Sequence, residues 1–326
     1  MVLRINIRAI DSMTMTFGDH SPLAWIAFNI LILAILAADL GIFHRKSREI
    51  PVHEALLALS GYIALALSFN AWVYFQFGRE RALEFLTGYF IEYALSMDNI
   101  LVFVVILGYF RVPAEYQMRL LLWGILGALL LRALFILGGF ALIETFEWTL
   151  VILGGFLIFT GVRTMLSGDE TIDLQDSRVI KITRRLFPIT PEYDGDRFFT
   201  RLPSGKAVAT PLFLVLVVLN VTDVLFALDS IPAIFAITRD PFIVYTSNVF
   251  AILGLRALYF VLAGMVDKFR YLKYGLSLGL IFIGLKMIYS YRLGHIPTEW
   301  TLGVTAVLIF GSIVASVIHN RVAEGK

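Results

Sequence analysis

Long apolar stretches alternate with short polar connections along almost the whole chain. A transmembrane helix needs about 20 mostly apolar residues, and nine stretches come close to that length: 22–43, 55–76, 83–109, 118–140, 147–166, 208–237, 242–265, 273–291 and 300–319. The pattern predicts an all-α polytopic membrane protein with about nine transmembrane helices. Since most connections are short, we expect residues 1–326 to form a single transmembrane domain.

Composition excludes a water-soluble fold and several kinds of chemistry. Apolar residues make up 59% of the chain and charged residues 16%, against about half and a quarter in soluble domains. The chain contains no cysteine, which excludes thiolate metal sites and cysteine nucleophiles within it. A net charge of +2 gives no case for a nucleic-acid partner. We expect membrane lipid as the surrounding partner and no tightly bound cofactor.

The distribution of Lys and Arg predicts the orientation of the helices. Cytoplasmic connections of membrane proteins carry an excess of these residues. With the N-terminus outside, seventeen basic residues fall on the cytoplasmic side and six on the outer side. The sequence therefore predicts a multi-pass protein of the cell membrane with its N-terminus outside and its C-terminus in the cytoplasm. Residues 167–206, which hold seven basic and seven acidic residues, form the expected cytoplasmic loop, and a Pro-Ser-Gly turn at 203–205 predicts a short hairpin there.

Two parts of the chain share the same motifs in the same order. Each has an acid, five residues, an aspartate and a small polar residue, then Leu-Arg-Ala-Leu in the next span, then a glycine-containing run that ends in a basic residue. The matches are 92–99 with 223–230, 131–134 with 255–258, and 155–163 with 279–286. The polar residues of the first match are Glu92, Asp98, Asn99, Asp223, Asp229 and Ser230.

These matches define two repeats of three helices each, 83–166 and 208–291. Because three is an odd number, consecutive copies must enter the membrane from opposite faces. Inverted repeats of this kind occur in secondary transporters, where the substrate site lies near the bilayer midplane between the copies. The sequence therefore predicts two inverted three-helix repeats with a site between them.

The shared acids would lie inside the membrane, where charge is costly. An ionised carboxylate at a helix centre costs about 2.5–3.5 kcal/mol on insertion scales, so the four acids need partners. Arg132 and Arg256, one in each repeat, are the expected counter-charges. Two acids are left over, and Asp39 in the first span is a further candidate. The surplus of negative charge favours a bound cation, and a purely structural network of salt bridges is the alternative.

Helix geometry separates the two acids of each motif. Six residues correspond to a rise of about 9 Å and a rotation near 600°, so Glu92 and Asp98 point about 120° apart. In the sixth span, Pro232 lacks the amide that would bond to the Leu228 carbonyl. This predicts a break in the helix and a carbonyl ligand beside Asp229.

Other polar residues in the spans have structural interpretations as well. Asn220 and Asn248 are further candidate oxygen ligands, although hydrogen bonds between helices are the favoured explanation for both. Arg163 and Lys286 lie nearer span ends and are expected to extend their charges to the membrane surface. A site built from oxygen ligands suits Mg²⁺, Ca²⁺ or Mn²⁺.

The same residues carry a resemblance to a known family. The runs 85–99, 228–236 and 247–257 are similar to the TerC family of membrane proteins and, within it, to the Alx branch. The resemblance covers nearly the whole chain and implies a membrane metal-ion transporter, with Mn²⁺ export and a response to pH associated with this branch. It also implies that the family's intramembrane acids correspond to Glu92, Asp98, Asp223 and Asp229, with Asp39 as a further candidate.

We therefore expect an exporter of a hard divalent cation and no enzyme activity, with Mn²⁺ favoured by the resemblance alone. Exchange for protons is the expected driving force, because a carboxylate in an apolar site takes up a proton when its metal leaves. One alternative is a membrane-protein assembly or scaffold factor whose acids form a structural network. Another is an intramembrane aspartyl protease built on Asp98 and Asp229, although no Gly-x-Gly-Asp accompanies either residue.

Overall fold

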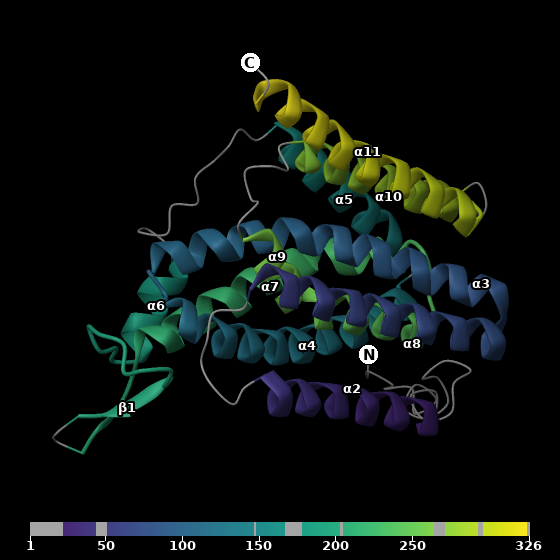
Figure 1. Ribbon diagram of the computed structural model, residues 1–326. Helices are drawn as coiled ribbons and strands as arrows, with labels where there is room; N and C mark the ends of the chain where they lie inside the picture. Colours follow the sequence, from purple (N-terminus) through teal and green to yellow (C-terminus); the bar gives the residue numbers. More distant parts are fainter. Residues whose placement is uncertain are drawn as a thin grey trace, which may run out of the picture.

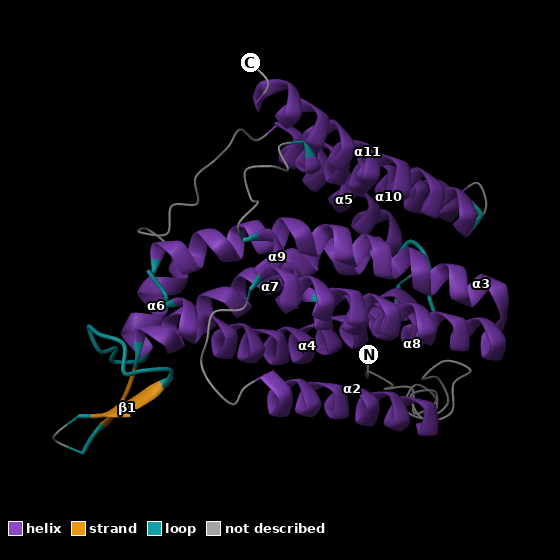
Figure 2. Ribbon diagram, viewed as in Figure 1, coloured by secondary structure: helices purple, strands orange, loops and turns teal. Residues whose placement is uncertain are grey.

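Helices make up nearly all of the described structure (Figure 2). The computed structural model describes residues 22–43, 51–146, 148–166, 178–202, 205–263, 271–292 and 296–324. The elements, labelled in Figure 1, are α2 (Pro22–Phe43), α3 (Val52–Tyr109), α4 (Ala114–Thr145), α5 (Thr149–Leu166), α6 (Arg178–Leu186), β1 (Phe199–Arg201), β2 (Ala207–Ala209), α7 (Pro211–Phe235), α8 (Pro241–Leu253), α9 (Leu255–Leu262), α10 (Leu272–Arg292) and α11 (Thr298–Glu324). The protein is an all-α polytopic membrane protein, as the sequence predicts.

Seven helices of the described residues are long and apolar enough to cross a membrane, against about nine predicted. The difference lies in α2 and α3. The apolar segment of α2, Pro22–Ala38, is shorter than a full span by this measure. Helix α3 has 58 residues and covers both the second and the third predicted span.

A break at Gly78 explains how α3 can fit a bilayer. A straight helix of 58 residues would be roughly 87 Å long, about three times the thickness of the hydrocarbon core. Gly78 has φ 88° and ψ 176°, a backbone conformation that glycine adopts at little cost. Figure 1 shows the two halves of α3 running back alongside each other from this point.

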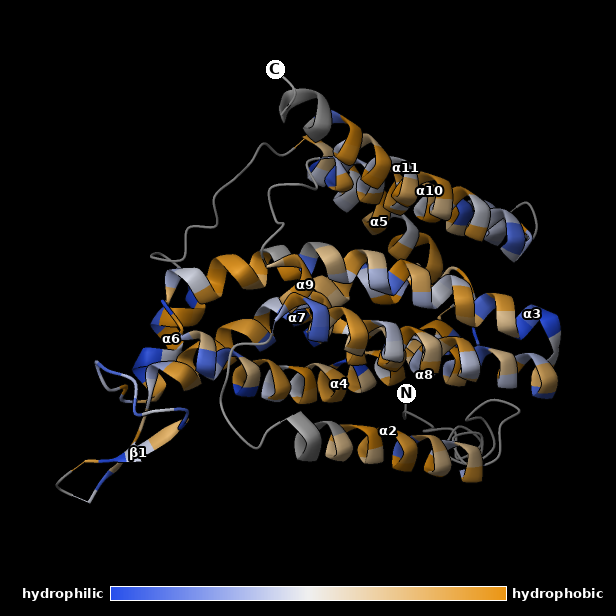
Figure 3. Ribbon diagram, in the orientation of Figure 1, coloured by the Kyte–Doolittle hydropathy of each residue, from blue (hydrophilic) through white to orange (hydrophobic). Residues whose placement is uncertain are grey.

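The helices form two groups that lie side by side (Figure 1). Helices α3, α4, α7, α8 and α9 pack into one bundle, and α5, α10 and α11 form the second group. Helix α2 covers another side of the bundle, where the Phe28 ring packs 5.8 Å from that of Phe250. Hydrophobic residues predominate along the helices (Figure 3), and many large ones are exposed, including Phe75 at 80% exposure and Val307 at 72%. An apolar exterior is what a lipid environment favours.

Helices α5 and α10 approach each other closely at glycines. A Cβ built on Gly284 would lie 2.6 Å from the Gly154 carbonyl oxygen, and one built on Gly161 would lie 2.8 Å from the Ser277 carbonyl oxygen. From the first contact to the second, the position on α5 rises from Gly154 to Gly161 while the position on α10 falls from Gly284 to Ser277. The two helices are therefore antiparallel. An offset of 123 residues, the one that relates Arg163 to Lys286, converts the first contact into the second. This is the symmetry that an inverted repeat requires, and the repeat itself stays a prediction.

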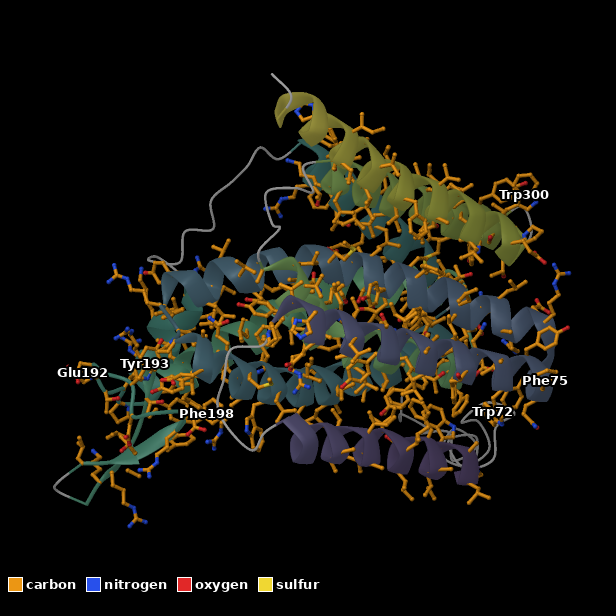
Figure 4. The ribbon with its side chains drawn as sticks, in the orientation of Figure 1. Trp72, Phe75, Glu192, Tyr193, Phe198 and Trp300 are labelled. Atoms are coloured by element: carbon orange, nitrogen blue, oxygen red, sulfur yellow. The ribbon has the colours of Figure 1, made fainter. Side chains whose placement is uncertain are left out.

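The polar segment before α7 forms the predicted hairpin. Strands β1 and β2 pair antiparallel, with Thr200 opposite Val208. The Tyr193 hydroxyl donates to the Phe110 carbonyl at 2.9 Å, and burial raises the pKa of this phenol, which keeps it protonated as a donor. These contacts hold the segment against the connection between α3 and α4. Figure 4 shows Tyr193 and Phe198 at the opposite end of the molecule from Trp72 and Phe75.

Candidate metal-ion site

Arg132 is the centre of a buried polar cluster inside the bundle. It lies in the middle of α4, directly after the apolar run Leu129-Leu130-Leu131, and its side chain is only 2% exposed. It forms an ion pair with Glu92 of α3 through NH1, and a second with Asp223 of α7 at 3.3 Å through NH2. The structure thus brings Arg132, the predicted counter-charge of the first repeat, together with two of the four predicted acids.

Glu92 and Asp223 contact the guanidinium in different ways. Asp223 accepts from both NH2 at 3.3 Å and Nε at 3.4 Å, so both of its oxygens face Arg132. Glu92 is fully buried and uses Oε1 for Arg132 and for the Ser96 hydroxyl, which lies 3.4 Å away. Among the described residues, Glu92 Oε2 accepts no hydrogen bond. This oxygen is therefore a free electron-pair donor in the centre of the protein.

Two neutral side chains complete the cluster. The Asn248 carbonyl oxygen from α8 accepts from Arg132 NH1 at 3.0 Å, and the Ser230 hydroxyl from α7 accepts at 3.3 Å. Both are buried. The sequence allowed either a structural or a ligand role for Asn248. Its hydrogen bond with Arg132 makes it part of the cluster.

The cluster joins the two predicted repeats. Glu92 and Arg132 come from the first, whereas Asp223, Ser230 and Asn248 come from the second. Two carboxylates and one guanidinium leave this trio with a net charge of −1, buried where an uncompensated charge is expensive. Arg256 is also buried, in α9, so both predicted arginines lie inside the protein.

The second acid of the α7 motif is separate from the cluster. Asp229 is half-buried and faces the Thr160 hydroxyl of α5. This separation follows from the rotation of about 120° between residues six apart on a helix. The predicted break at Pro232 is wrong for this structure, because α7 continues as a helix to Phe235. Pro232 still has no amide to donate to the Leu228 carbonyl, so the Leu228 carbonyl ligand stays a prediction. The Leu228 side chain lines an apolar cavity of about 570 Å³ between α4, α5 and α7.

The remaining predicted residues have different positions. Asn99 is buried in α3. Asn220 donates to the Leu216 carbonyl at 2.9 Å and packs against Gly127 of α4, which is a contact between helices. The side chains of Asp98 and Asp39 lie outside the described residues. Within the described part of the chain, no three His, Cys, Asp or Glu side chains gather into a metal-binding group.

The structure also shows a buried cation that the sequence did not single out as such. Lys286 was expected to reach the membrane surface, and this is wrong, because the residue is 3% exposed. It lines a polar cavity together with Glu84, which is also buried. Glu84 stands at the start of an otherwise apolar span, and this position was the signal that could have drawn attention to it.

Comparison with known proteins places the chain in a family. The profile described as "Integral membrane protein TerC family" matches residues 77–324, beginning beside the break in α3. An uncharacterized membrane protein of Myxococcus xanthus is 50% identical over 92% of this chain and 94% of its own length. A protein of Escherichia coli K12 named "Putative membrane-bound redox modulator Alx" is 43% identical over 92% of this chain and 94% of its own length. No solved structure gives a significant match. The chain belongs to the TerC family of integral membrane proteins.

Proposed function

We propose that this protein exports a hard divalent cation, Mn²⁺ in the first place, through the cluster around Arg132. The proposal rests on one observation. Glu92 and Asp223, one from each predicted repeat, are both buried and both pair with the guanidinium of Arg132. In secondary transporters built from inverted repeats, substrate sites lie between the copies near the midplane. Intramembrane acids at such a place are functional far more often than incidental.

The chemistry of the cluster fits an oxygen-ligated cation as substrate. Carboxylates from Glu92 and Asp223, the Ser230 hydroxyl and the Asn248 carbonyl oxygen are all hard donors. Hard donors suit Mg²⁺, Ca²⁺ and Mn²⁺, and the family resemblance selects Mn²⁺ among them. The unused Oε2 of Glu92 offers a first contact that does not require Arg132 to move.

Arg132 would act as the counter-charge in the transport cycle. While it pairs with both acids, it balances one of their two buried negative charges. An arriving divalent cation replaces the guanidinium as the partner of the carboxylates, and Arg132 returns when the ion leaves. Protons can fill the same role on the return step, because a buried carboxylate without a cation favours its neutral form. This gives a simple route to exchange of metal for protons.

The name of the Escherichia coli relative describes redox modulation, and cation export would have such an effect indirectly. The chain contains no cysteine, so thiol chemistry is not available to it. Manganese is a redox-active metal, and its export would alter the redox state of the cytoplasm without any redox group in the transporter. The proposal therefore needs only the metal-ion cluster.

Cellular manganese under a manganese load tests the proposal. Glu92→Gln and Asp223→Asn remove charge with little change in shape, so we expect both variants to insert normally and to accumulate Mn²⁺ as cells without the protein do. Glu299→Gln is the matched control, because Glu299 is about half exposed and pairs with Arg79 at 3.7 Å outside the cluster. If both cluster variants keep cellular manganese at the wild-type level, the site is elsewhere and a scaffold role becomes the better account.

A further inference from the structure

The polar cavity that Lys286 and Glu84 line lies at the end of the bundle where α3 breaks. Its volume is about 260 Å³, and its walls come from α3, α10 and the connection between α7 and α8. At about 30 Å³ per water, it has room for about eight waters or for a small ion with some water. By the predicted orientation, this end faces the outside of the cell. The cavity is distinct from the cluster around Arg132, with which it shares no residue.

One wall of this cavity carries two donors without partners. Lys286 Nζ is buried, and among the described residues nothing accepts a hydrogen bond from it. Ser290 lies one helical turn further along α10, on the same face, and its hydroxyl also has no partner there. Both residues line the cavity. A buried ammonium group without an acceptor is costly, so these donors favour a ligand that accepts hydrogen bonds.

The acid on the opposite wall is already neutralised. Glu84 Oε2 accepts from Arg81 NH1 at 2.8 Å and from the Thr238 hydroxyl at 2.7 Å. Arg81 also pairs with Asp240 at 3.5 Å, and Asp240 caps α8 by accepting from the Phe242 amide at 3.0 Å. Glu84 attracts Lys286 electrostatically, but its Oε2 is engaged by Arg81 and Thr238, and it accepts no hydrogen bond from the Lys286 ammonium.

The charges around the cavity favour an anion. Arg239 lines it and is exposed among the described loop residues. Among the residues that line the cavity, Lys286 and Arg239 are positive and Glu84 is negative, which leaves one positive charge in excess on its walls. A single anion would balance the group, whereas water would satisfy the donors without balancing the charge.

We propose that this cavity binds a small oxyanion, with a carboxylate or phosphate group held by Lys286 Nζ and the Ser290 hydroxyl. Arg239 stands at the same cavity as a further donor. Lysine is a common phosphate ligand because its ammonium acts as a compact point charge. The inference is independent of the proposed cation transport, since it uses none of the residues around Arg132.

Titration of the purified full-length protein with inorganic phosphate tests the site. At matched ionic strength against chloride, we expect phosphate to bind and to raise the midpoint of thermal unfolding. Lys286→Met should weaken binding by about ten- to a hundredfold, the value of a charge-assisted hydrogen bond, and Ser290→Ala should weaken it less. Lys273→Met is the matched control, because it removes a lysine at the other end of α10. Lys286→Arg keeps the charge and should retain binding, so it tests the site even if Lys286→Met does not fold.

A second arm separates two sources of the same chemistry. Nanodiscs of phosphatidylcholine are compared with nanodiscs that also contain phosphatidylglycerol. If phosphatidylglycerol competes with phosphate in the wild type and in Lys286→Arg, the ligand is a lipid headgroup; if it has no effect on phosphate binding, the ligand is a free anion. Equal phosphate binding by wild type and Lys286→Met, or no binding by either, would overturn the proposal and leave Lys286 as a neutral packed amine.

Discussion

Arg132 is the residue on which the contacts of the candidate site converge, with acceptors from α3, α7 and α8. The contribution of Arg132 to stability depends on whether its two carboxylate partners are present. Breaking a buried charge pair by removing one member leaves an uncompensated charge, whereas removing both members can be nearly neutral. The same logic applies to transport, because a cation that binds Glu92 and Asp223 takes the place of the guanidinium.

Removing Arg132 should therefore be harmful in a way that a second substitution repairs. Arg132→Met is expected to cost about 3–5 kcal/mol of stability, since Glu92 and Asp223 stay buried without their partner. The double variant Arg132→Met with Asp223→Asn should recover part of that loss. Thermal unfolding in detergent measures both effects. Arg119→Met serves as the control, because the Arg119 ion pair with Asp196 is partly exposed and worth about 1 kcal/mol at most. A failure of both Glu92→Gln and Asp223→Asn to rescue would remove the counter-charge role.

At the scale of elements, the contact between α5 and α10 is the best structural support for the inverted repeat. The sequence match pairs Gly155 with Gly279, yet the close contacts use Gly154, Gly161 and Gly284. Gly155 and Gly279 have open space around them, whereas Gly161 and Gly284, which lie in the same matched runs, contact the partner helix. Similarity thus located the right pair of helices, whereas only the packed structure shows which faces touch, because that depends on the rotation of each helix.

Alanine substitutions at neighbouring glycines should separate the two faces. Gly284→Ala and Gly154→Ala place a Cβ within 3 Å of backbone oxygen on the partner helix, so we expect a loss of about 1–3 kcal/mol. Gly155→Ala and Gly279→Ala meet nothing within 4 Å and should be neutral or stabilising by up to about 1 kcal/mol. Thermal unfolding of the four variants checks this. Equal effects at Gly154 and Gly155 would contradict the observed contact.

At the scale of the whole molecule, the sequence predicts the features that follow from placing the chain in a membrane. The fold class follows from nine apolar stretches, and an arginine beside intramembrane acids follows from the need to pair buried charge, but the sequence does not say that Arg132 meets Glu92 and Asp223. What it does not predict depends on packing between distant segments. From sequence alone, Lys286 could extend to the surface or stay buried. The packing of α3 and of the connection after α7 around it determines which of the two occurs. Likewise Pro232 can break a helix, but α7 stays helical within its packed surroundings.

The orientation of the molecule is a prediction of its own. An N-terminus outside, with inverted repeats, requires the segments after α5 and before α10 to lie in the cytoplasm. Alkaline phosphatase fused after Met165 or at Lys273 should be inactive, and a fluorescent cytoplasmic reporter at the same places should be active. A periplasmic signal at one fusion point and a cytoplasmic signal at the other would mean that the two repeats do not have opposite orientations, and periplasmic signals at both would contradict the predicted orientation.

The most direct test of the central claim is Mn²⁺ flux in proteoliposomes that contain only this protein. With and without a pH gradient, wild-type protein should carry Mn²⁺ well above protein-free liposomes, and the gradient should increase the rate. Glu92→Gln and Asp223→Asn should lower the flux at least about tenfold, because a hard cation needs anionic oxygens in place of its hydration shell, while Glu299→Gln should transport as the wild type does. Wild-type flux no greater than that of empty liposomes, or equal flux in the two cluster variants, would contradict the account.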